Sequence, residues 1–461
     1  MHGAPGEFSH DQLLAYHRRH AWQPFTQMKL APDPVFIERG SGAHLFTKDG
    51  RRIIDAIGSW WVNVHGHSHP AINQAITAQM ERVEHVIYAG LAHEPATVLA
   101  QRLSATTGDR LPRVFYSDNG STAVEIALKM AFQFFANQGT SERREFIALG
   151  EGYHGDTIGA MSVGARGVFH EMYAPLLFPT HLLPTPRAPF AVFDDDERAL
   201  EHLAPALDAL EKLLVERGEK ICGLILEPVI QGASAGFNIY PPVFLKRVRE
   251  LCDRYGIFWI ADEVFTGCGR TGRFYACEHA GVWPDILCTS KALAGGYLPF
   301  AATLASERVF LGFYSDERRH TLFHGHSMTA NPLGCAAALA SLDLIGADQA
   351  DGFARIKALE RRHRAHLNDL ADGPAAAHIR EVRCLGSVAA VELNLPADYT
   401  ADLGWRLMAA AIRRGVLLRP LGNVVYLTPA YVIAPDELAQ AYDVLGECLK
   451  ELLGPHPAGE R

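Results

Sequence analysis

The middle of the chain alternates short, continuously apolar runs with segments of helical periodicity. The apolar runs are ICGLIL (221–226), IFWIA (257–261), DILCTS (285–290) and FAATLA (300–305). Between the first two lies FLKRVRELCDRY (244–255), an amphipathic helical pattern that Gly256 should end. Strands that are apolar throughout are typical of parallel sheets covered by helices on both faces. The pattern therefore predicts an α/β fold with a mostly parallel sheet flanked by helices.

The two ends of the chain have a different pattern. Residues 35–65 are rich in turn residues, which indicates a small antiparallel sheet. After about residue 345 come a long helical stretch, alternating strands and a terminal helix. For a chain of 461 residues we therefore expect a large domain at 76–344. A smaller α+β domain would be assembled from residues 1–75 and 345–461.

Composition excludes several classes of function. Lys and Arg number 43 against 52 Asp and Glu, a net charge of −9, which argues against nucleic acid as a partner. No apolar stretch approaches the ~18 residues of a membrane span, and the N-terminal segment lacks the apolar core of a secretory signal. The eight cysteines are scattered without a C-x-x-C pair, which indicates reduced thiols and no structural zinc site. We therefore expect a cytoplasmic protein that does not bind a membrane.

Charged residues follow two of the apolar runs. Asp262 ends the run IFWIAD, and Lys291 follows DILCTS beside the glycines at 295–296. The carboxyl edge of an open α/β sheet is where such proteins bind ligands. A helix cap or an ion pair would explain Asp262 equally well, and a surface position is the commoner fate of a single lysine. The two together favour a site, in which burial would make Lys291 a nucleophile.

A third element is SDNGST (117–122), which lies between the run RVFYS (113–117) and a helical segment, AVEIALKMAFQFF. Gly120, Ser121 and Thr122 at a helix N-terminus could bind an anion, although an ordinary N-cap explains them as well. A lysine, a carboxylate and an anion cradle are what pyridoxal phosphate requires. The aromatic ring of Tyr153 could lie on the ring of this cofactor.

Longer motifs carry a resemblance to a known family. They are GYHGDTIGAMSVG (152–164), ILEPVIQGA (225–233), ADEVFTGCGRTG (261–272), TSKALAGGYLP (289–299) and HGHSMTANPLGCAAA (324–338). In order and spacing they resemble the class III pyridoxal-phosphate aminotransferases of fold type I, over residues from about 20 to 445. WQPFTQM (22–28) and SWWVNVHGHSHP (59–70) are similar to the members that convert 8-amino-7-oxononanoate to 7,8-diaminononanoate in biotin synthesis, with S-adenosylmethionine as amino donor.

The resemblance implies a role for individual residues. Lys291 would bind the cofactor covalently and move the substrate proton, and Asp262 would pair with the ring nitrogen. Gly120 and Ser121 would bind the phosphate, and Tyr153 would stack on the ring and touch substrate. His326 and Ser327 would reach the phosphate from the second subunit of a homodimer with shared active sites. The substrate site would be lined by Phe25, Trp60, Gly325 and Arg419.

Physical arguments support two of these substrate residues. Arg419 lies in the apolar run VLLRP, where a guanidinium needs an anion, either a substrate carboxylate or an internal one. Trp60 and Trp61 could both be core aromatics. If they lie in a strand, alternation should turn one toward the core and the other toward the site.

Some positions depart from the family pattern. Many members have Tyr at the position of Phe25 and Pro-Thr at that of His326 and Ser327, so both departures concern the recognition of substrate and donor. Many ω-aminotransferases carry Gln at the position of Phe265, which favours the narrower assignment.

Three alternatives remain. GCGRTG (267–272) matches the dinucleotide fingerprint of an NAD-dependent oxidoreductase, which should open a long helix. The histidines of HGHSHP (65–70), echoed by His324 and His326, could hold zinc in a hydrolase. Within the aminotransferases, the rival is another class III enzyme acting on ω-amino acids or diamines.

Overall fold

The structure is a computed structural model that describes residues 8–454. Its largest element is a seven-stranded sheet in the order β4-β12-β11-β10-β7-β5-β6. The strands are β4 (Arg113–Ser117), β5 (Glu145–Leu149), β6 (His181–Leu183), β7 (Ile221–Leu226), β10 (Phe258–Asp262), β11 (Ile286–Thr289) and β12 (Ala301–Ala305). Only β12 runs against its two neighbours, so the other strands end at one edge. The predicted mostly parallel sheet is confirmed.

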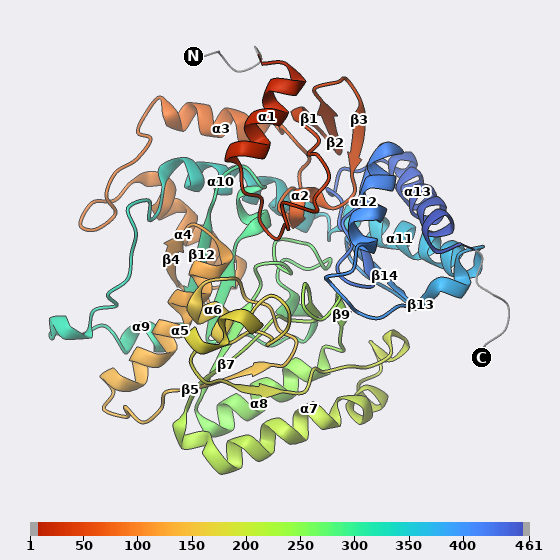
Figure 1. Ribbon diagram of the computed structural model, residues 1–461. Helices are drawn as coiled ribbons and strands as arrows, with labels where there is room; N and C mark the ends of the chain where they lie inside the picture. The colour runs from red at the N-terminus through yellow and green to blue at the C-terminus, as the bar shows by residue number, and fades with distance from the viewer. Residues whose placement is uncertain (1–7, 455–461) are drawn as a thin grey trace.

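Helices cover this sheet on both faces. Phe258 and Ile260 of β10 pack in one apolar cluster with α5 (Gly120–Asn137). Trp259 and Ala261 of the same strand pack on the other face with α7 (Asp196–Arg217) and α8 (Val243–Tyr255). Figure 1 shows α7 and α8 side by side at the bottom of the molecule. This alternation explains why the strand is apolar at every position.

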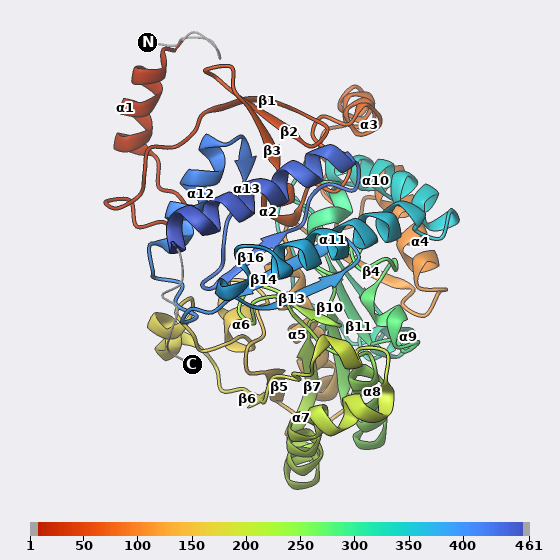
Figure 2. The ribbon, with the colours of Figure 1, turned by 90° about the vertical axis from the view of Figure 1, so that its right-hand side faces the viewer.

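Three smaller sheets accompany the large one, and one of them joins the N-terminal and C-terminal parts of the chain. β1 (Ile37–Ser41), β2 (His44–Thr47) and β3 (Arg52–Asp55) are antiparallel, and β15 (Val416–Leu417) joins β3 in parallel. β13 (Ile379–Leu385), β14 (Val388–Leu393) and β16 (Val424–Leu427) form a second antiparallel sheet. β8 (Ile230–Gln231) and β9 (Asn238–Ile239) form a short ribbon. In Figure 2 the C-terminal helices lie in front of these sheets and below β1–β3.

The remaining helices complete the layers. They are α1 (His10–His20), α2 (Gly58–Trp61), α3 (Pro70–Met80), α4 (Glu94–Thr106), α6 (Ile158–Ser162), α9 (Glu307–Leu311), α10 (Pro332–Ala350), α11 (Ala354–Asp372), α12 (Leu403–Arg413) and α13 (Pro435–Leu453). Among the helices of residues 8–454, none is long and apolar enough to cross a membrane. All eight cysteines are free and buried.

Two predictions placed residues in strands where the structure has none. Trp60 and Trp61 lie in the short helix α2, where both have a positive φ, and not in a strand. They still separate as expected, because Trp61 is buried and Trp60 is 37% exposed. Arg419 lies two residues beyond β15, in the loop before β16, rather than within a strand. By contrast, α8 ends as predicted, at Gly256 with a left-handed φ of 65°.

Candidate active site

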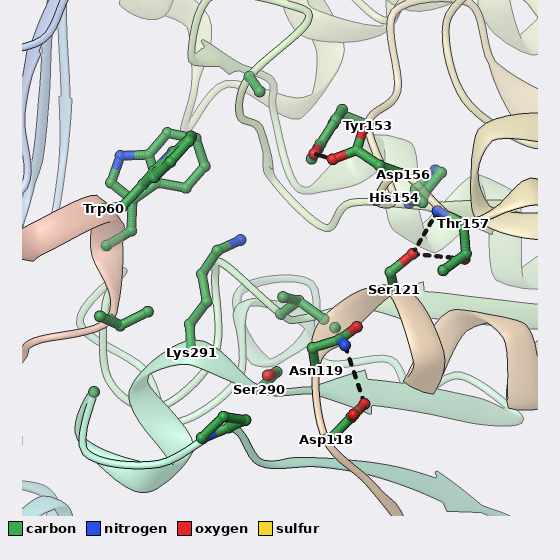
Figure 3. A pocket seen from close by; sticks show the side chains of 18 of the residues that line it. Trp60, Asp118, Asn119, Ser121, Tyr153, His154, Asp156, Thr157, Ser290 and Lys291 are labelled. Atoms are coloured by element: carbon green, nitrogen blue, oxygen red, sulfur yellow. Dashed lines mark hydrogen bonds between the residues drawn. The ribbon is translucent and has the colours of Figure 1, made fainter. Parts of the chain in front are cut away.

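The loops that follow neighbouring strands meet at the carboxyl edge of the large sheet. Together with segments from the N-terminal and C-terminal parts of the chain, these loops line a cavity of about 770 Å³. Figure 3 shows Lys291 extending into this space, with Trp60 on one side and Ser121 and Tyr153 on the other. This edge is where open α/β sheets bind ligands. Seven of the predicted site residues line the cavity, namely Phe25, Trp60, Gly120, Ser121, Tyr153, Lys291 and Arg419.

Lys291 opens a single 3-10 turn directly after β11, with a φ of 42°. The hydroxyl of Ser290 donates to the carbonyl of Phe300 (2.8 Å), which fixes the end of the strand. The lysine amine lies 5.0 Å from the ring centre of Trp61. Burial lowers the pKa of Lys291 to about 8, although the charge of Asp262 opposes this shift. A neutral amine is therefore accessible near neutral pH, as a nucleophile requires.

Asp262 is the last residue of the adjacent strand β10, where it pairs with Cys288, three positions before Lys291. It is 4% exposed, and its carboxylate accepts two hydrogen bonds. One comes from the backbone of Val264 (3.0 Å) and the other joins it to Nδ1 of His154 (2.7 Å). The carboxylate lies behind the cavity wall, of which His154 and Val264 form part.

His154 is electrostatically coupled to two carboxyl groups at the site. Burial lowers its pKa, but the hydrogen bond to Asp262 and the charges of Asp262 and Glu227 outweigh burial, so the pKa is raised. Glu227, at the end of β7, accepts from the backbone of Tyr153 (3.0 Å) and of Gly232 (2.9 Å). Burial raises the pKa of Glu227 to about 7. One histidine is thus held between two carboxyl groups in the interior.

The start of α5 forms one end of the cavity. Asn119 caps the helix by accepting from the backbone of Thr122 (3.0 Å). This cap satisfies the amide of Thr122 and leaves those of Gly120 and Ser121 for a ligand. A Cβ on Gly120 would come within 2.5 Å of Val264, so the helix start lies closely against the loop after β10. The hydroxyl of Ser121 is hydrogen-bonded to that of Thr157 (2.7 Å). Two hydroxyls thus lie beside the first amides of a helix at the cavity wall, a suitable site for an anion.

Tyr153 forms the wall beside this helix start. Its hydroxyl donates to Asp156 (2.8 Å), a contact drawn in Figure 3. Its ring stacks on His170 with centres 5.9 Å apart and an angle of 16°. Because one face of the ring is held in this way, the position of Tyr153 is fixed before any ligand binds.

Aromatic side chains and one arginine line the opposite end. The guanidinium of Arg419 lies over the ring of Trp60, 4.3 Å from its centre. Phe25 contacts Trp60 and Phe169 edge-on, with ring centres 5.6 and 5.7 Å apart. Tyr399 extends this wall, 4.6 Å from Phe169. Nη1 of Arg419 is shielded from solvent and has no hydrogen-bond partner in the part of the chain that is described, so the arginine can bind an anion.

Besides Asp262, which lies behind the wall, three predicted site residues do not line this cavity within their own chain. Gly325, His326 and Ser327 lie in the segment between His320 and α10, and none of them is among the lining residues. The backbone of His326 donates to the hydroxyl of Thr329 (3.0 Å). The segment is well exposed, with Phe323 71% exposed.

The residues proposed for a zinc site and for a dinucleotide site do not have the arrangement that either site requires. His65 is hydrogen-bonded to Ser341 (2.8 Å) and His67 to Asp55 (2.9 Å), so these histidines point to different partners. Within residues 8–454, no three or more His, Cys, Asp or Glu side chains are grouped to hold a metal ion. GCGRTG (267–272) is followed only by a 3-10 turn at Ala276–His279, not by the long helix of a dinucleotide site.

Several residues of the site were missed from the sequence. His154, Asp156 and Thr157 stand beside Tyr153 in one motif, and their polar side chains next to a predicted ring-stacking residue were a usable signal. Phe169 and Tyr399 carry no such signal, because each is an aromatic residue in a loop outside the motifs. Only the folded chain brings them to the cavity.

This fold, with a lysine and a carboxylate at adjacent strand ends, defines a class of enzyme. The family described as Aminotransferase class-III matches residues 27–449, and the chain belongs to it. It is an aminotransferase, and the α/β fold type I architecture predicted from the sequence is confirmed.

Within this family, the chain is similar to enzymes of one particular name. The chain is 45% identical over 434 residues to the adenosylmethionine-8-amino-7-oxononanoate aminotransferase of Synechococcus elongatus, covering 94% of this chain and 99% of that protein. It is 42% identical to the enzyme of the same name from Geobacter sulfurreducens, covering 97% and 99%.

Solved structures agree with these relatives. The crystal structure of the enzyme of that name from Methanocaldococcus jannaschii matches with a TM-score of 0.88 and 34% identity, covering 96% of this chain and 99% of that one. An amine transaminase from an uncultivated Pseudomonas species, in its PLP-bound form, matches with a TM-score of 0.84 and 34% identity, covering 93% and 98%.

Proposed function

We propose that this enzyme uses pyridoxal phosphate to transfer an amino group to 8-amino-7-oxononanoate, giving 7,8-diaminononanoate in biotin synthesis. The observation that carries the proposal is the pairing of β10 with β11, which brings Asp262 and Lys291 to one edge of the sheet. The curated relatives named above support the choice of acceptor. Their name also supports S-adenosylmethionine as the amino donor.

The residues at this edge fit pyridoxal phosphate. Lys291 is half-buried with a lowered pKa, as a covalent bond to an aldehyde requires. Asp262 is a buried carboxylate one strand away, and the start of α5 with Ser121 supplies donors for a phosphate. The cavity of about 770 Å³ has room for the cofactor and a substrate. When bound, pyridoxal phosphate accepts an amino group from one substrate and passes it to another.

Each side chain has a definite task in this scheme. Lys291 would hold the cofactor, and its amine would carry the proton taken from the substrate carbon. Asp262 keeps a proton on the ring nitrogen, and the hydrogen bond from His154 keeps the carboxylate oriented. Gly120 and Ser121 bind the phosphate group. Tyr153, held by Asp156 and His170, would lie against the ring of the bound cofactor and contact substrate.

The opposite end of the cavity would bind the acceptor. This acceptor is a long aliphatic chain that ends in a carboxylate, so it needs apolar walls and one cation. Phe25 and Trp60 provide the walls, and Arg419 provides the cation, with an Nη1 that has no partner among residues 8–454. The same cavity would bind the amino donor in the other half of the cycle.

The complete enzyme would be a homodimer with shared sites. Gly325, His326 and Ser327 do not line the cavity of their own chain, and they lie in an exposed segment with apolar side chains such as Phe323. In the second subunit these residues would reach the phosphate and the substrate. Sedimentation of the cofactor-loaded protein tests the dimer, and a monomer that is fully active contradicts it.

The domain division and the location are further parts of the proposal. The pairing of β15 with β3 supports a small domain built from residues 1–75 and 345–461, around a large domain at 76–344. Of these ranges, residues 1–7 and 455–461 lie outside the described part of the chain. The eight free cysteines support a reducing, cytoplasmic location.

Half-reactions of the cofactor-loaded enzyme test the function. S-adenosylmethionine, lysine and simple ω-amino acids are added separately, and the visible absorbance of the lysine-linked cofactor is followed. We expect S-adenosylmethionine to remove this absorbance and 8-amino-7-oxononanoate to restore it with formation of 7,8-diaminononanoate. A response to ω-amino acids alone would favour the amine transaminase activity named for a structural neighbour.

A further inference from the structure

The turn that carries Trp60 has an unusual backbone. Gly58, Ser59, Trp60 and Trp61 have successive φ values of 56°, 45°, 71° and 72°. For residues other than glycine this left-handed region is sparsely populated, and bulky side chains rarely adopt it. Such a run persists only where its surroundings hold it, and it is found most often at functional sites.

Asp55 is the group that holds this turn from within. It ends β3 and is 2% exposed. One carboxylate oxygen accepts from the backbone of Ile57 (3.3 Å) and of Ser59 (3.0 Å), and the other accepts from the Ser59 hydroxyl (2.6 Å). Although burial alone would raise the pKa of Asp55, hydrogen bonds from His67 and Ser59 lower it, so the carboxylate is charged.

His67 completes the network from outside the turn. Its Nε2 is hydrogen-bonded to Asp55 (2.9 Å), and its Nδ1 to the side-chain amide of Asn63 (2.9 Å). A carboxylate only accepts, so Nε2 carries the hydrogen. The backbone of His67 is itself fixed, because it exchanges two hydrogen bonds with Gly42 (2.8 and 3.2 Å). A Cβ on Gly40 would lie 2.7 Å from the His67 side chain, so β1 also packs against it.

The turn delivers both tryptophans to the active site. The ring of Trp60 lies under the guanidinium of Arg419, and the ring of Trp61 lies 5.0 Å from the amine of Lys291. Trp60 and Arg419 also line a second cavity of about 500 Å³, between residues 23–37 and α12. They therefore form the wall that separates the catalytic cavity from this second space.

We propose that Asp55 and His67 are positioning residues that set the acceptor specificity of the enzyme, by holding Trp60 and Arg419 as the closed end of the substrate site. They touch neither cofactor nor substrate and act only through the turn. Without the hydrogen bond from His67, the Asp55 carboxylate keeps its bonds within the turn but loses its link to His67. The turn and Trp60 can then shift together toward the second cavity. The inference rests on the proposed function for the nature of the acceptor.

The test compares three variants of the cofactor-loaded enzyme. His67→Ala removes the hydrogen bond, and His67→Gln keeps an N–H donor near the position of Nε2. His69→Ala is the matched control, since its ring lies in the same loop but packs against His65, with ring centres 6.2 Å apart. For each we measure kcat and KM for 8-amino-7-oxononanoate, and the preference for this acid over its amide.

We expect His67→Ala to raise KM about tenfold, or about 1.4 kcal/mol, with little change in kcat and a reduced preference for the acid. His67→Gln should recover most of the loss, and His69→Ala should match the wild type. Equal effects of the two alanine variants, or no recovery in His67→Gln, would overturn the proposal.

A second readout does not depend on the acceptor. The chain has 6 tryptophans, so labelling with 5-fluorotryptophan gives few fluorine NMR signals, and Trp60→Phe assigns that of Trp60. In His67→Ala we expect the Trp60 signal to shift and those distant from the turn to stay. An unmoved Trp60 signal refutes the positioning role. If instead the wild type does not use the acceptor while the signal shifts, the proposed substrate fails and the positioning role stands.

Discussion

Replacing Arg419 by alanine tests the substrate end of the cavity most directly. The guanidinium stacks on Trp60 at 4.3 Å, and its Nη1 has no partner within the described residues. The side chain is therefore oriented but its hydrogen-bonding capacity is not used. A substrate carboxylate in this position would accept two parallel hydrogen bonds from the planar guanidinium.

The size of the effect follows from this geometry. A hydrogen bond to a charged group contributes about 1.5–3 kcal/mol, and two such bonds set an upper limit of about 6 kcal/mol. Arg419 is partly exposed, and water competes with the carboxylate, so the lower part of this range applies. We expect Arg419→Ala to lose about 2–3 kcal/mol of transition-state stabilisation, which lowers kcat/KM for 8-amino-7-oxononanoate by about 30- to 150-fold.

The amide of the acceptor is the essential comparison. It keeps the chain length but carries no charge, so Arg419→Ala should change its kcat/KM by less than about fivefold. Arg406→Ala is the matched control, because this arginine lies on the nearby helix α12 and pairs with Asp402 one turn earlier. Equal losses for the acid and the amide would refute the assignment of Arg419 to the carboxylate.

Three further predictions concern the cofactor end. Lys291→Ala should still bind pyridoxal phosphate but lose the covalent bond and at least about 10³-fold in turnover; borohydride reduction and peptide mapping to another lysine of the wild type would contradict it. Asp262→Asn should fold normally and lose at least about 100-fold in turnover, and near-normal activity would mean that this carboxylate does not protonate the ring. Because burial lowers the pKa of Lys291 to about 8, the rate of cofactor loading should rise with pH and level off above about 8. The charge of Asp262 raises that pKa, so in Asp262→Asn the midpoint should move to lower pH, and an unchanged midpoint would refute the coupling. A wild-type midpoint near that of an ordinary lysine, about 10.4, would contradict the lowering of the pKa by burial.

The strands and their ends were predictable because one physical rule governs them. Runs that are apolar at every position must be buried on both faces, and the predicted runs match β7, β10, β11 and β12 to within one or two residues. Parallel strands end at a common edge, so the residues after them meet there. That rule is sufficient to bring Asp262, Lys291 and the start of α5 to the same edge of the sheet.

The turn at 58–61 shows where such rules fail. Alternation in a strand separated Trp60 from Trp61 correctly, yet the backbone there is left-handed. The cause is a network formed by Asp55 and His67, 12 positions apart, which outweighs the local preference of the backbone. No propensity scale for single residues contains this effect, because the stabilising groups belong to other elements.

Asp262 and Glu263 show the same limit at the centre of the site. Asp262 ends the apolar run and Glu263 follows it, so two carboxylates are adjacent in the sequence. Glu263 accepts from the backbone of Ala276 (3.0 Å) and Cys277 (2.9 Å), the first two residues of a 3-10 turn, and burial raises its pKa to about 7. Asp262 instead meets His154, a residue 108 positions earlier. These partners of the two carboxylates come from segments distant in the sequence, so the local pattern around residues 262 and 263 does not encode them.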